Sequence, residues 1–550
     1  MNSQVIASKK DPNDNIKTSL WENLRNFSQA RLAWLWLLVG FLLLPFTAWQ
    51  NVIPLAAWLA PVFLLRFART SHRPRLVVPL IILAYAGAIF IDWRNGPMDT
   101  LSVIIGISMS LARGLLYCLP YLADLRIGSR LGSWGRWMVF PLAFVSVDWV
   151  TSLLKSTTTH GSSAYSQYPI LSLIQVISIT GMWGLTFLIA WFASTANACW
   201  EESFHWQKIW RKLAIFTGVL LLAFIYGSLR LSLPLGRQSL VSNQNVIVAT
   251  ITNETIFEPL NSIDLGTFYQ SNDAERAAVR SKFAAVNNLM FDRIATALRA
   301  GAQIVVTQET AGLVLEEDKT QVLERASSLA SQYQAYLDIT LWVFSRAQAL
   351  PYIHNQTFLI DPEGQIEWAY EKTYPVFGGE NFLVYSGSGK LPVIDTPFGR
   401  MSAAICNDLN FPALLRQTGQ NHVDILIAPF NDEPDISTQD PAEAAFRTIE
   451  NGVSSIRAAG RGLSMVIDPE GRVLASQDYF TTDSHVMVAA LPLHSETTLY
   501  SRMGDWFAYI CIAGFVLLTI WAFTHRKQPA AQPGNPAGFS EEPSDTYTPD

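Results

Sequence analysis

The sequence predicts a layered α/β domain attached to a multi-pass α-helical membrane domain, and three observations predict this fold class. The 550 residues exceed the usual size of one domain. Half of them are hydrophobic and only 15% are charged, which is unusual for a soluble protein of this length. Apolar runs crowd residues 31–232 and recur at 506–524, whereas the stretch between them has the composition of an ordinary globular domain.

The charge and the cysteines exclude several classes of function. A formal charge of −6, with no basic stripe, argues against nucleic-acid binding. No C-x-x-C pair or Cys/His cluster occurs, so neither a zinc site nor a disulfide framework is predicted, and no metal or cofactor is expected. Of the four cysteines, Cys118, Cys199 and Cys511 lie in or beside apolar segments, and only Cys406 lies in the globular stretch.

About eight membrane crossings are expected, since a helix needs about 20 mostly apolar residues to cross the hydrocarbon core. The stretch 168–199 is long enough to hold an interfacial or re-entrant piece before its crossing. Asp148 is interpreted either as a partly hydrated residue near the outer interface or as a contact for a lipid headgroup. The crossings are expected near residues 32–50, 52–67, 75–92, 101–122, 134–153, 176–199, 211–231 and 506–524.

The basic residues between the crossings predict which side each loop faces. One set of alternate loops is rich in arginine and lysine, whereas the opposite short loops offer only Arg94 and Lys155. Because basic residues are retained on the cytoplasmic side, the rich loops and both termini are predicted to be cytoplasmic, with residues 233–505 outside. The rich loops contain Arg66, Arg69, Arg73, Arg75, Arg126, Arg130, Arg136, Lys208, Arg211 and Lys212.

These patterns divide the chain into five predicted segments. Residues 1–30 form a cytoplasmic segment without the pattern of a cleaved signal peptide, and residues 31–232 a membrane domain with about seven helices. Residues 240–500 form an extracytoplasmic domain, and 506–524 the last crossing. Residues 525–550, rich in Pro, Gly, Ser and acids, are predicted to be a disordered cytoplasmic tail.

Strands and helices alternate in the outer domain, which indicates a layered α/β arrangement. Buried strands are predicted at NVIVATIT, QIVVTQE, YLDITLWVFS, RMSAAICND, VDILIAPFND, LSMVIDPEG and 485–492. Amphipathic helices are predicted at 273–301, 318–333 and 441–459. TFLIDPEGQIEWAYEK is predicted to be a hairpin that turns at Asp361-Pro362-Glu363-Gly364.

Three residues of reactive types stand where predicted strands end, the position at which α/β domains place functional groups. Glu309 follows IVVTQ, Lys372 closes IEWAYEK, and Cys406 closes MSAAIC. A cysteine nucleophile needs a base to take its proton and a cation to stabilise an oxyanion, and Glu and Lys supply both roles without a metal. The alternative for Cys406 is a small buried core residue. An unpaired structural thiol would be a liability in an oxidising compartment, so the functional interpretation is favoured.

The combination resembles the nitrilase (carbon–nitrogen hydrolase) superfamily, and in particular the bacterial apolipoprotein N-acyltransferase family. EKTYPVFGGE, AAICND and RTIENGVSSIRAAGRGLSMVIDPEGRVL resemble its outer domain. AYSQYPILSLIQVISITGMWGLTFL and TTLYSRMGDWFAYI resemble its membrane portion and the junction with its last crossing. The resemblance covers most of residues 30–525 and implies a nitrilase-like four-layer α-β-β-α sandwich on a multi-pass domain in the bacterial inner membrane.

The resemblance also implies a two-step acyl exchange without a cofactor. Glu309 would be the general base, Cys406 would attack the sn-1 ester of a phospholipid, and Lys372 would stabilise the oxyanion. The thioester would then pass its acyl chain to the α-amine of a diacylglyceryl-cysteine lipoprotein. Glu380 would support the site or its loop. The implied partners are a phospholipid donor, a diacylated lipoprotein acceptor and the membrane, with no nucleic acid.

The sequence departs from the family pattern around the expected centre. Asn407 and Asp408 follow the nucleophile where the family has an aromatic residue and a glutamate, and Asp408 is interpreted as a shorter supporting acid beside Asn407. Glu433-Pro434-Asp435 stands where the family tends to place an aromatic residue. These positions bear on acceptor and acyl-chain specificity more than on the thiol chemistry.

Two other functions stay open at this point. The same three residues could give the acyl group to water or to a different amine, which would make the protein a membrane-tethered amidase or a divergent acyltransferase. A protein of another class, an inactive lipoprotein-binding or scaffold protein, is less favoured because it has no reason to keep Glu309, Lys372 and Cys406 together.

Overall fold

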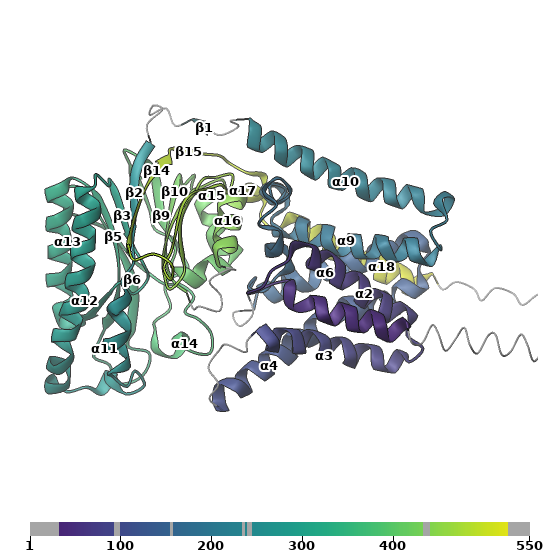
Figure 1. Cartoon of the computed structure of the whole chain (residues 1–550), viewed down its shortest axis with the longest axis horizontal. Helices are drawn as coiled ribbons and strands as arrows, with labels where there is room; N and C mark the ends of the chain where they lie inside the picture. The colour runs from purple at the N-terminus through teal and green to yellow at the C-terminus, as the bar shows by residue number, and fades with distance from the viewer. Residues whose placement is uncertain are drawn as a thin grey trace, which may run out of the picture.

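A computed structural model describes residues 32–92, 100–154, 158–233, 237–238, 245–432 and 440–525. In this part of the chain a bundle of helices lies beside an α/β domain (Figure 1). Several predictions fall outside the described residues. They concern the N-terminal segment 1–30, Arg94, Lys155, Glu433-Pro434-Asp435 and all of the tail beyond residue 525.

Two β-sheets form the centre of the α/β domain. One is seven-stranded, in the order β14-β2-β3-β5-β6-β7 with β4 beside β5, and the other is six-stranded, in the order β13-β12-β11-β10-β9-β8. The central pairs β2–β3, β3–β5, β9–β10 and β10–β11 are parallel, and antiparallel strands flank them. The strands are β2 (Asn245–Ile251), β3 (Ile304–Thr307), β4 (Gly312–Leu315), β5 (Tyr336–Phe344), β6 (Ile353–Ile360), β7 (Ile366–Glu371), β8 (Val393–Thr396), β9 (Gly399–Ala403), β10 (Ile425–Asn431), β11 (Ser454–Gly460), β12 (Leu463–Ile467), β13 (Val473–Asp478) and β14 (Val486–Pro492), and β1 (Arg237–Gln238) pairs with β15 (His494–Ser495).

The alternation of side chains along the strands explains how the layers pack. In β3, Ile304 and Val306 belong to the core between the two sheets, together with Met401 and Ile427 of the other sheet. Val305, one residue away, faces the helix layer outside. Helices α12 (Asp273–Arg299) and α13 (Lys319–Tyr333) cover the seven-stranded sheet, and α15 (Pro412–Gln420) and α16 (Asp440–Asn451) cover the other (Figure 1). The predicted α-β-β-α sandwich is therefore the observed fold.

The helix predicted over 441–459 is wrong in its second half. α16 ends at Asn451, and Gly452 turns the chain with a φ of +68°. Residues 454–460 then form β11, a buried strand that pairs with β10 in parallel and with β12 in antiparallel orientation. The sequence SSIRAAG has no clear hydrophobic period and is compatible with either structure, and its pairing with β10 and β12 makes it a strand.

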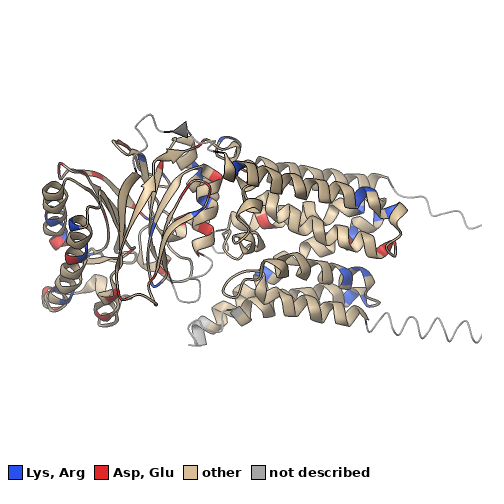
Figure 2. Cartoon of the chain, turned by 45° about the horizontal axis from the view of Figure 1, so that its top comes forward, with Lys and Arg blue, Asp and Glu red and all other residues tan. Residues whose placement is uncertain are grey.

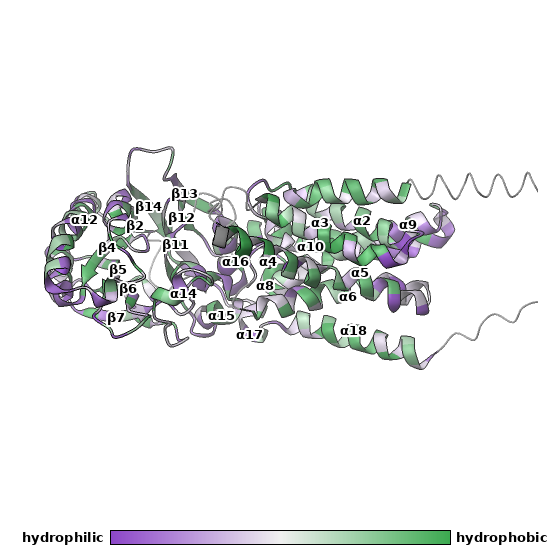
Figure 3. Cartoon of the chain, turned by 90° about the horizontal axis from the view of Figure 1, so that it is seen from below, coloured by the Kyte–Doolittle hydropathy of each residue, from purple (hydrophilic) through white to green (hydrophobic). Residues whose placement is uncertain are grey.

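Helices occupy each segment predicted as a crossing. By length and composition, four described helices are apolar enough to cross a membrane, or five if one bent pair counts as a span, so the count of about eight is not confirmed. Figure 3 shows hydrophobic residues over most of the helical domain. The helices in the segments predicted as crossings are the helix over Leu32–Phe46, α2 (Pro54–Thr70), α3 (Pro74–Asp92), α4 (Thr100–Tyr117), α5 (Leu119–Arg126), α6 (Ser133–Ser152), α9 (Met182–Glu201), α10 (Trp206–Ser232) and α18 (Trp506–Thr524).

The bent pair matches the piece predicted before the sixth crossing. The short helices α7 (Leu171–Ile174) and α8 (Ile177–Thr180) precede α9, and the chain bends there by 117°. Gly181 makes the bend with a φ of +63°, and a Cβ atom on it would lie 2.5 Å from the ring of Tyr500. A glycine is needed here both for its backbone conformation and for this close approach.

Asp148 on α6 is buried inside the helical domain rather than partly hydrated near an interface. Only 4% of it is exposed, and it accepts hydrogen bonds from the hydroxyl groups of Tyr117 (3.1 Å), Ser162 (2.9 Å) and Thr186 (3.1 Å). Three separate segments therefore satisfy its oxygens. The expected hydration was wrong because the loop that contains Ser162 covers this end of the helix, which the hydropathy of α6 alone does not reveal.

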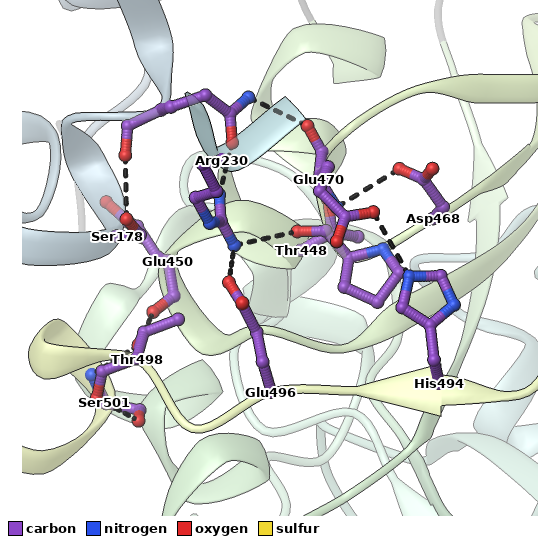
Figure 4. A network of polar contacts seen from close by, with 12 residues as sticks. Ser178, Arg230, Thr448, Glu450, Asp468, Glu470, His494, Glu496, Thr498 and Ser501 are labelled. Carbon is purple, nitrogen blue, oxygen red and sulfur yellow. Dashed lines mark hydrogen bonds and ion pairs between the residues drawn. The ribbon is translucent and has the colours of Figure 1, made fainter. Parts of the chain in front are cut away.

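A polar network joins the two domains (Figure 4). Arg230, near the end of α10, donates to the side chains of Gln175 and Glu496. Gln175 also donates to the backbone oxygen of Glu470 (2.9 Å), whose carboxylate lies 3.1 Å from His494 Nε2. Since Gln175 lies between α7 and α8, the network holds the segments that follow β12 and β15 against the helical domain.

Candidate active site

The ends of three strands meet at one place between the two sheets. Glu309 lies just after β3, Lys372 directly follows β7, and Cys406 begins the 3₁₀ turn η8 (Cys406–Asn410) after β9. Lys372 Nζ lies 2.7 Å from Glu309 Oε1, and the thiol of Cys406 is within electrostatic reach of both charges. The structure therefore brings together all three residues that the sequence singled out.

Lys372 is clamped between two carboxylates. Its Nζ lies 2.7 Å from Glu309 Oε1 and 2.7 Å from Glu380 Oε2, and only 1% of the lysine is exposed. Asn355 Nδ2 donates to both acids, at 2.7 and 2.9 Å. Burial alone would lower the pKa of Lys372, but the attraction of Glu309 and Glu380 outweighs it and raises the pKa well above 10.5. The ammonium group thus stays charged.

Glu309 is positioned by both sheets. Its Oε2 accepts from the backbone N–H of Asn431 in β10 (3.1 Å), and its own N–H donates to Phe430 O (3.1 Å). Burial raises the pKa of Glu309 above 4.5, the charge of Glu380 adds to this rise, and Lys372 opposes it. A carboxylate with a raised pKa is a better proton acceptor than one in water, as a general base requires.

Cys406 is held in an uncommon backbone conformation. Its φ is +46°, in the left-handed region that non-glycine residues rarely adopt and that often marks functional turns. Burial raises the pKa of the thiol well above 9.0, and the nearby acids Glu309, Asp440 and Asp432 reinforce this, while Lys372 opposes it. At rest the group is a neutral thiol, so it needs a base at the moment of attack.

Asp408 stabilises the turn that begins with Cys406. It accepts hydrogen bonds from Tyr370 Oη (2.7 Å), Tyr374 N (2.8 Å) and Ile405 N (3.1 Å). These bonds tie the nucleophile turn to the segment that follows Lys372. Asn407 adds a bond from its Nδ2 to Tyr374 O (2.9 Å). Both predicted supporting residues thus fix the distance between the two segments.

The sequence did not single out Asn355, which contacts both acids. It is fully buried in β6, in IHNQTFLI, and an amide amid apolar residues of a strand was the available signal. The contribution of Asn431 comes from its backbone N–H, for which a sequence contains no signal.

The nucleophile turn is also attached to the helical domain. Thr159 Oγ1 donates to Asn410 O (3.0 Å) at the end of η8 and accepts from Tyr165 Oη (2.8 Å). Arg447 of α16 in turn donates to Tyr165 Oη (3.0 Å). A loop of the helical domain therefore sets the position of the turn that begins with Cys406, and no sequence pattern indicated this contact.

One group of described residues has side chains that could hold a metal ion. The ligand atoms of His160, Asp440 and Glu443 lie within 4.8 Å of one another, and His160 Nδ1 lies 3.0 Å from Glu443 Oε1. His160 belongs to the loop of Thr159, and the two acids belong to α16. The group lies at the junction of the domains, and its member Asp440 is one of the acids near Cys406.

Comparison with known proteins gives matches in both domains. The family model of the apolipoprotein N-acyltransferase N-terminal domain matches residues 39–195, and that of carbon-nitrogen hydrolase matches residues 272–499, so together they span more than half of the chain. The apolipoprotein N-acyltransferase of Geobacter metallireducens is 25% identical over 70% of this chain and 74% of its own length. That of Gloeobacter violaceus is 24% identical over 85% and 89%.

Solved structures similar to this chain include an amidase of the nitrilase superfamily from Nesterenkonia AN1. It is 18% identical, and the match covers 50% of this chain and 96% of the amidase with a TM-score of 0.37.

Proposed function

We propose that this chain, which belongs to the apolipoprotein N-acyltransferase family, transfers an acyl chain from a phospholipid to the N-terminal amine of diacylglyceryl-cysteine lipoproteins through a thioester on Cys406. The observation that carries the proposal is the buried contact between Lys372 and Glu309 (2.7 Å), which lies with the buried thiol of Cys406 at the ends of three strands. Base, cation and nucleophile are the groups that acyl transfer through a thioester needs.

In the first step, Glu309 takes the proton of the Cys406 thiol while Sγ attacks the carbonyl carbon of the sn-1 ester. The carbonyl oxygen becomes an oxyanion, which the ammonium group of Lys372 stabilises. When the C–O bond breaks, Glu309 gives its proton to the leaving glycerol oxygen, so a lysophospholipid departs and the acyl chain stays on sulfur. Glu380 shares Lys372 with Glu309 and keeps the ammonium charged throughout.

In the second step, the α-amine of the lipoprotein attacks the thioester. Glu309 takes a proton from the attacking nitrogen, and Lys372 again stabilises the oxyanion. The C–S bond breaks, the proton returns to sulfur, and the amide product leaves Cys406 as it was. Since both substrates keep their acyl chains in lipid, the site must face the membrane.

We also propose that the chain crosses the bacterial inner membrane about eight times, with residues 31–232 as the main membrane domain and 506–524 as the last crossing. The catalytic domain, residues 240–500, is then extracytoplasmic, and both termini are cytoplasmic. Lysines and arginines gather at the end of the helical domain away from the sandwich, which supports this orientation (Figure 2).

The test is intact-mass spectrometry of the purified protein after incubation with phosphatidylethanolamine. The expected result is a mass gain of one acyl chain that hydroxylamine removes and that the Cys406→Ala variant lacks. A diacylated lipopeptide should then discharge the adduct and gain the acyl chain. Discharge by water alone would favour a hydrolase, and absence of any adduct with the phospholipids tested would refute the proposal.

A further inference from the structure

A polar cavity lies at the end of the helical domain that faces away from the sandwich. Its volume is about 300 Å³, and residues of α2, α6, α9 and α10 line it. That volume is many times the roughly 10–15 Å³ that one water molecule needs, so the cavity is large enough for a phosphate group. The charged residues of the lining are Arg69, Arg136, Lys212, Glu201 and Glu202.

The arginine and lysine side chains of this cavity are not all neutralised by acids. Arg69 pairs with Asp124 (2.6 Å), and Arg69 and Arg136 share Glu201, each at 3.4 Å. Lys212 is different, because within the described residues no carboxylate oxygen lies within 4.0 Å of its Nζ. The ammonium group instead donates to Ser133 O (3.1 Å) and Ser133 Oγ, and only 7% of the lysine is exposed.

Two further features of the cavity favour an anion. The Nε–H of Arg136 is buried and has no hydrogen-bond partner among the described residues. Ser133 is the first residue of the 20-residue helix α6, whose N-cap, Gly132, offers no side-chain acceptor. The first N–H groups of a helix and its dipole stabilise negative charge, so this end of α6 adds to the field of Lys212 and Arg136.

The cavity lies at the level where lipid headgroups are expected. Trp134, Trp206 and Trp210, near the starts of α6 and α10, are 48%, 66% and 43% exposed. Exposed tryptophans at helix ends are typical of the membrane–water interface. The cluster of basic residues at this end in Figure 2 agrees with such a position.

We propose that this cavity binds a phosphate group, with Lys212 and Arg136 as its main ligands. The source is either the headgroup of a phospholipid in the leaflet opposite the catalytic domain or free phosphate. An ammonium-bearing headgroup would also find Glu201 and Glu202 at the same cavity. The site is remote from Cys406 and does not depend on acyl transfer.

Binding can be measured by native mass spectrometry of the full-length protein with phosphatidylglycerol, in the Cys406→Ala background so that no acyl transfer interferes. Loss of one charge-assisted contact weakens binding by roughly tenfold or more. We expect this loss in Lys212→Gln and in Arg136→Gln. Lys212→Arg should retain binding, as should Arg211→Gln, which removes an exposed charge from the same turn of α10 outside the cavity.

A parallel titration with inorganic phosphate separates the two sources. Displacement of one bound phosphatidylglycerol, or direct binding that the Lys212 and Arg136 variants weaken, would identify free phosphate as a ligand. Lipid binding that phosphate does not displace would identify the headgroup. Should Lys212→Gln fail to fold, the Arg136→Gln variant still tests the proposal. It is expected to fold because 30% of the Arg136 side chain is exposed. Equal binding of both ligands by Arg136→Gln and Arg211→Gln would overturn the proposal.

Discussion

Buried carboxylates are held in different ways in the two domains. Asp148 lies in the helical domain. All the hydrogen bonds described for its carboxylate come from hydroxyl groups, which belong to three separate segments. Glu309, in the sandwich, accepts from an ammonium group, an amide and a backbone N–H. Hydroxyl partners hold neighbouring helices together without a change of charge. A cation beside a carboxylate stabilises its ionised form, so the carboxylate can release and take up a proton, as the proposed reaction requires of Glu309.

The largest expected effect is on the rate of thioester formation, which should depend on Glu309 far more than on Asp148. Glu309→Gln keeps the shape of the side chain but removes the base, so the rate of thioester formation at Cys406 should fall by roughly 10²- to 10⁴-fold. Asp148→Asn also keeps the shape and should reduce that rate by no more than about the factor expected for one weakened hydrogen bond, roughly tenfold. Quenched-flow intact-mass measurements give both rates. An equal loss in the two variants would mean that Glu309 has no special role as a base.

The next effect is on stability. Lys372→Met leaves the buried Glu309 and the partly buried Glu380 without their cation, and breaking a buried pair by removing one partner costs about 3–5 kcal/mol. The melting temperature in detergent should fall accordingly. Lys319→Met is the matched control, because Lys319 donates to Gln356 (3.1 Å) and has no carboxylate within 4.0 Å in the described part of the chain.

A double variant tests the cause of the lost stability. Adding Glu380→Gln to Lys372→Met removes one of the two unpaired acids and should restore part of the melting temperature. If the double variant is as unstable as the sum of the single variants predicts, repulsion between the two acids is not the cause.

A smaller effect is expected where the two domains meet. Thr159→Val removes both hydrogen bonds of the Thr159 hydroxyl group, the one donated to Asn410 O (3.0 Å) and the one accepted from Tyr165 Oη (2.8 Å). Each neutral hydrogen bond is worth about 1 kcal/mol, so thioester formation should slow by up to roughly thirtyfold. Thr296→Val, which removes a hydroxyl from the exposed face of α12, should leave the rate unchanged. If the rate falls only in proportion to the amount of folded protein, Thr159 stabilises the fold and does not position the nucleophile.

Both domains also show what a sequence can and cannot predict. Glu309, Lys372 and Cys406 were found because their types and their places after strands suffice to identify them. Asp408 was expected as a shorter supporting acid, but the sequence did not indicate that its oxygens would accept from Tyr370 Oη and from the backbone of residues 374 and 405. Side-chain direction in a turn depends on φ and ψ, which composition does not determine.

The sequence was a weaker guide wherever packing between distant segments decides the structure. The strand at 454–460 was assigned to a helix because the sequence SSIRAAG has no clear hydrophobic period. The burial of Asp148 depends on a loop that lies 14 residues away at Ser162. Likewise, the contact between Thr159 and Asn410 joins residues 251 positions apart. Such contacts have no local pattern.

Asp338 shows whether the type of hydrogen-bond partner or the domain determines how a buried acid behaves. It lies in β5 of the sandwich, but like Asp148 it accepts a hydrogen bond from a hydroxyl group, that of Thr357. It is fully buried, and burial raises its pKa to about 7. Between its usual 3.8 and about 7 the folded chain holds a proton that the unfolded chain has lost, so this acid makes stability fall as pH rises through that window.

The smallest expected effect follows from this pKa. Asp338→Asn should leave the melting temperature at pH 4 nearly unchanged and raise it at pH 8, by roughly 2–4 °C per kcal/mol recovered. Asp395→Asn, on an exposed carboxylate paired with Arg400, should show no such gain at pH 8. Equal changes of the Asp338→Asn variant at both pH values would mean that the hydroxyl of Thr357 keeps the ionised acid stable. The buried charge of Asp338 would then be satisfied without a cation, and the cation beside Glu309 would be needed for chemistry rather than for burial.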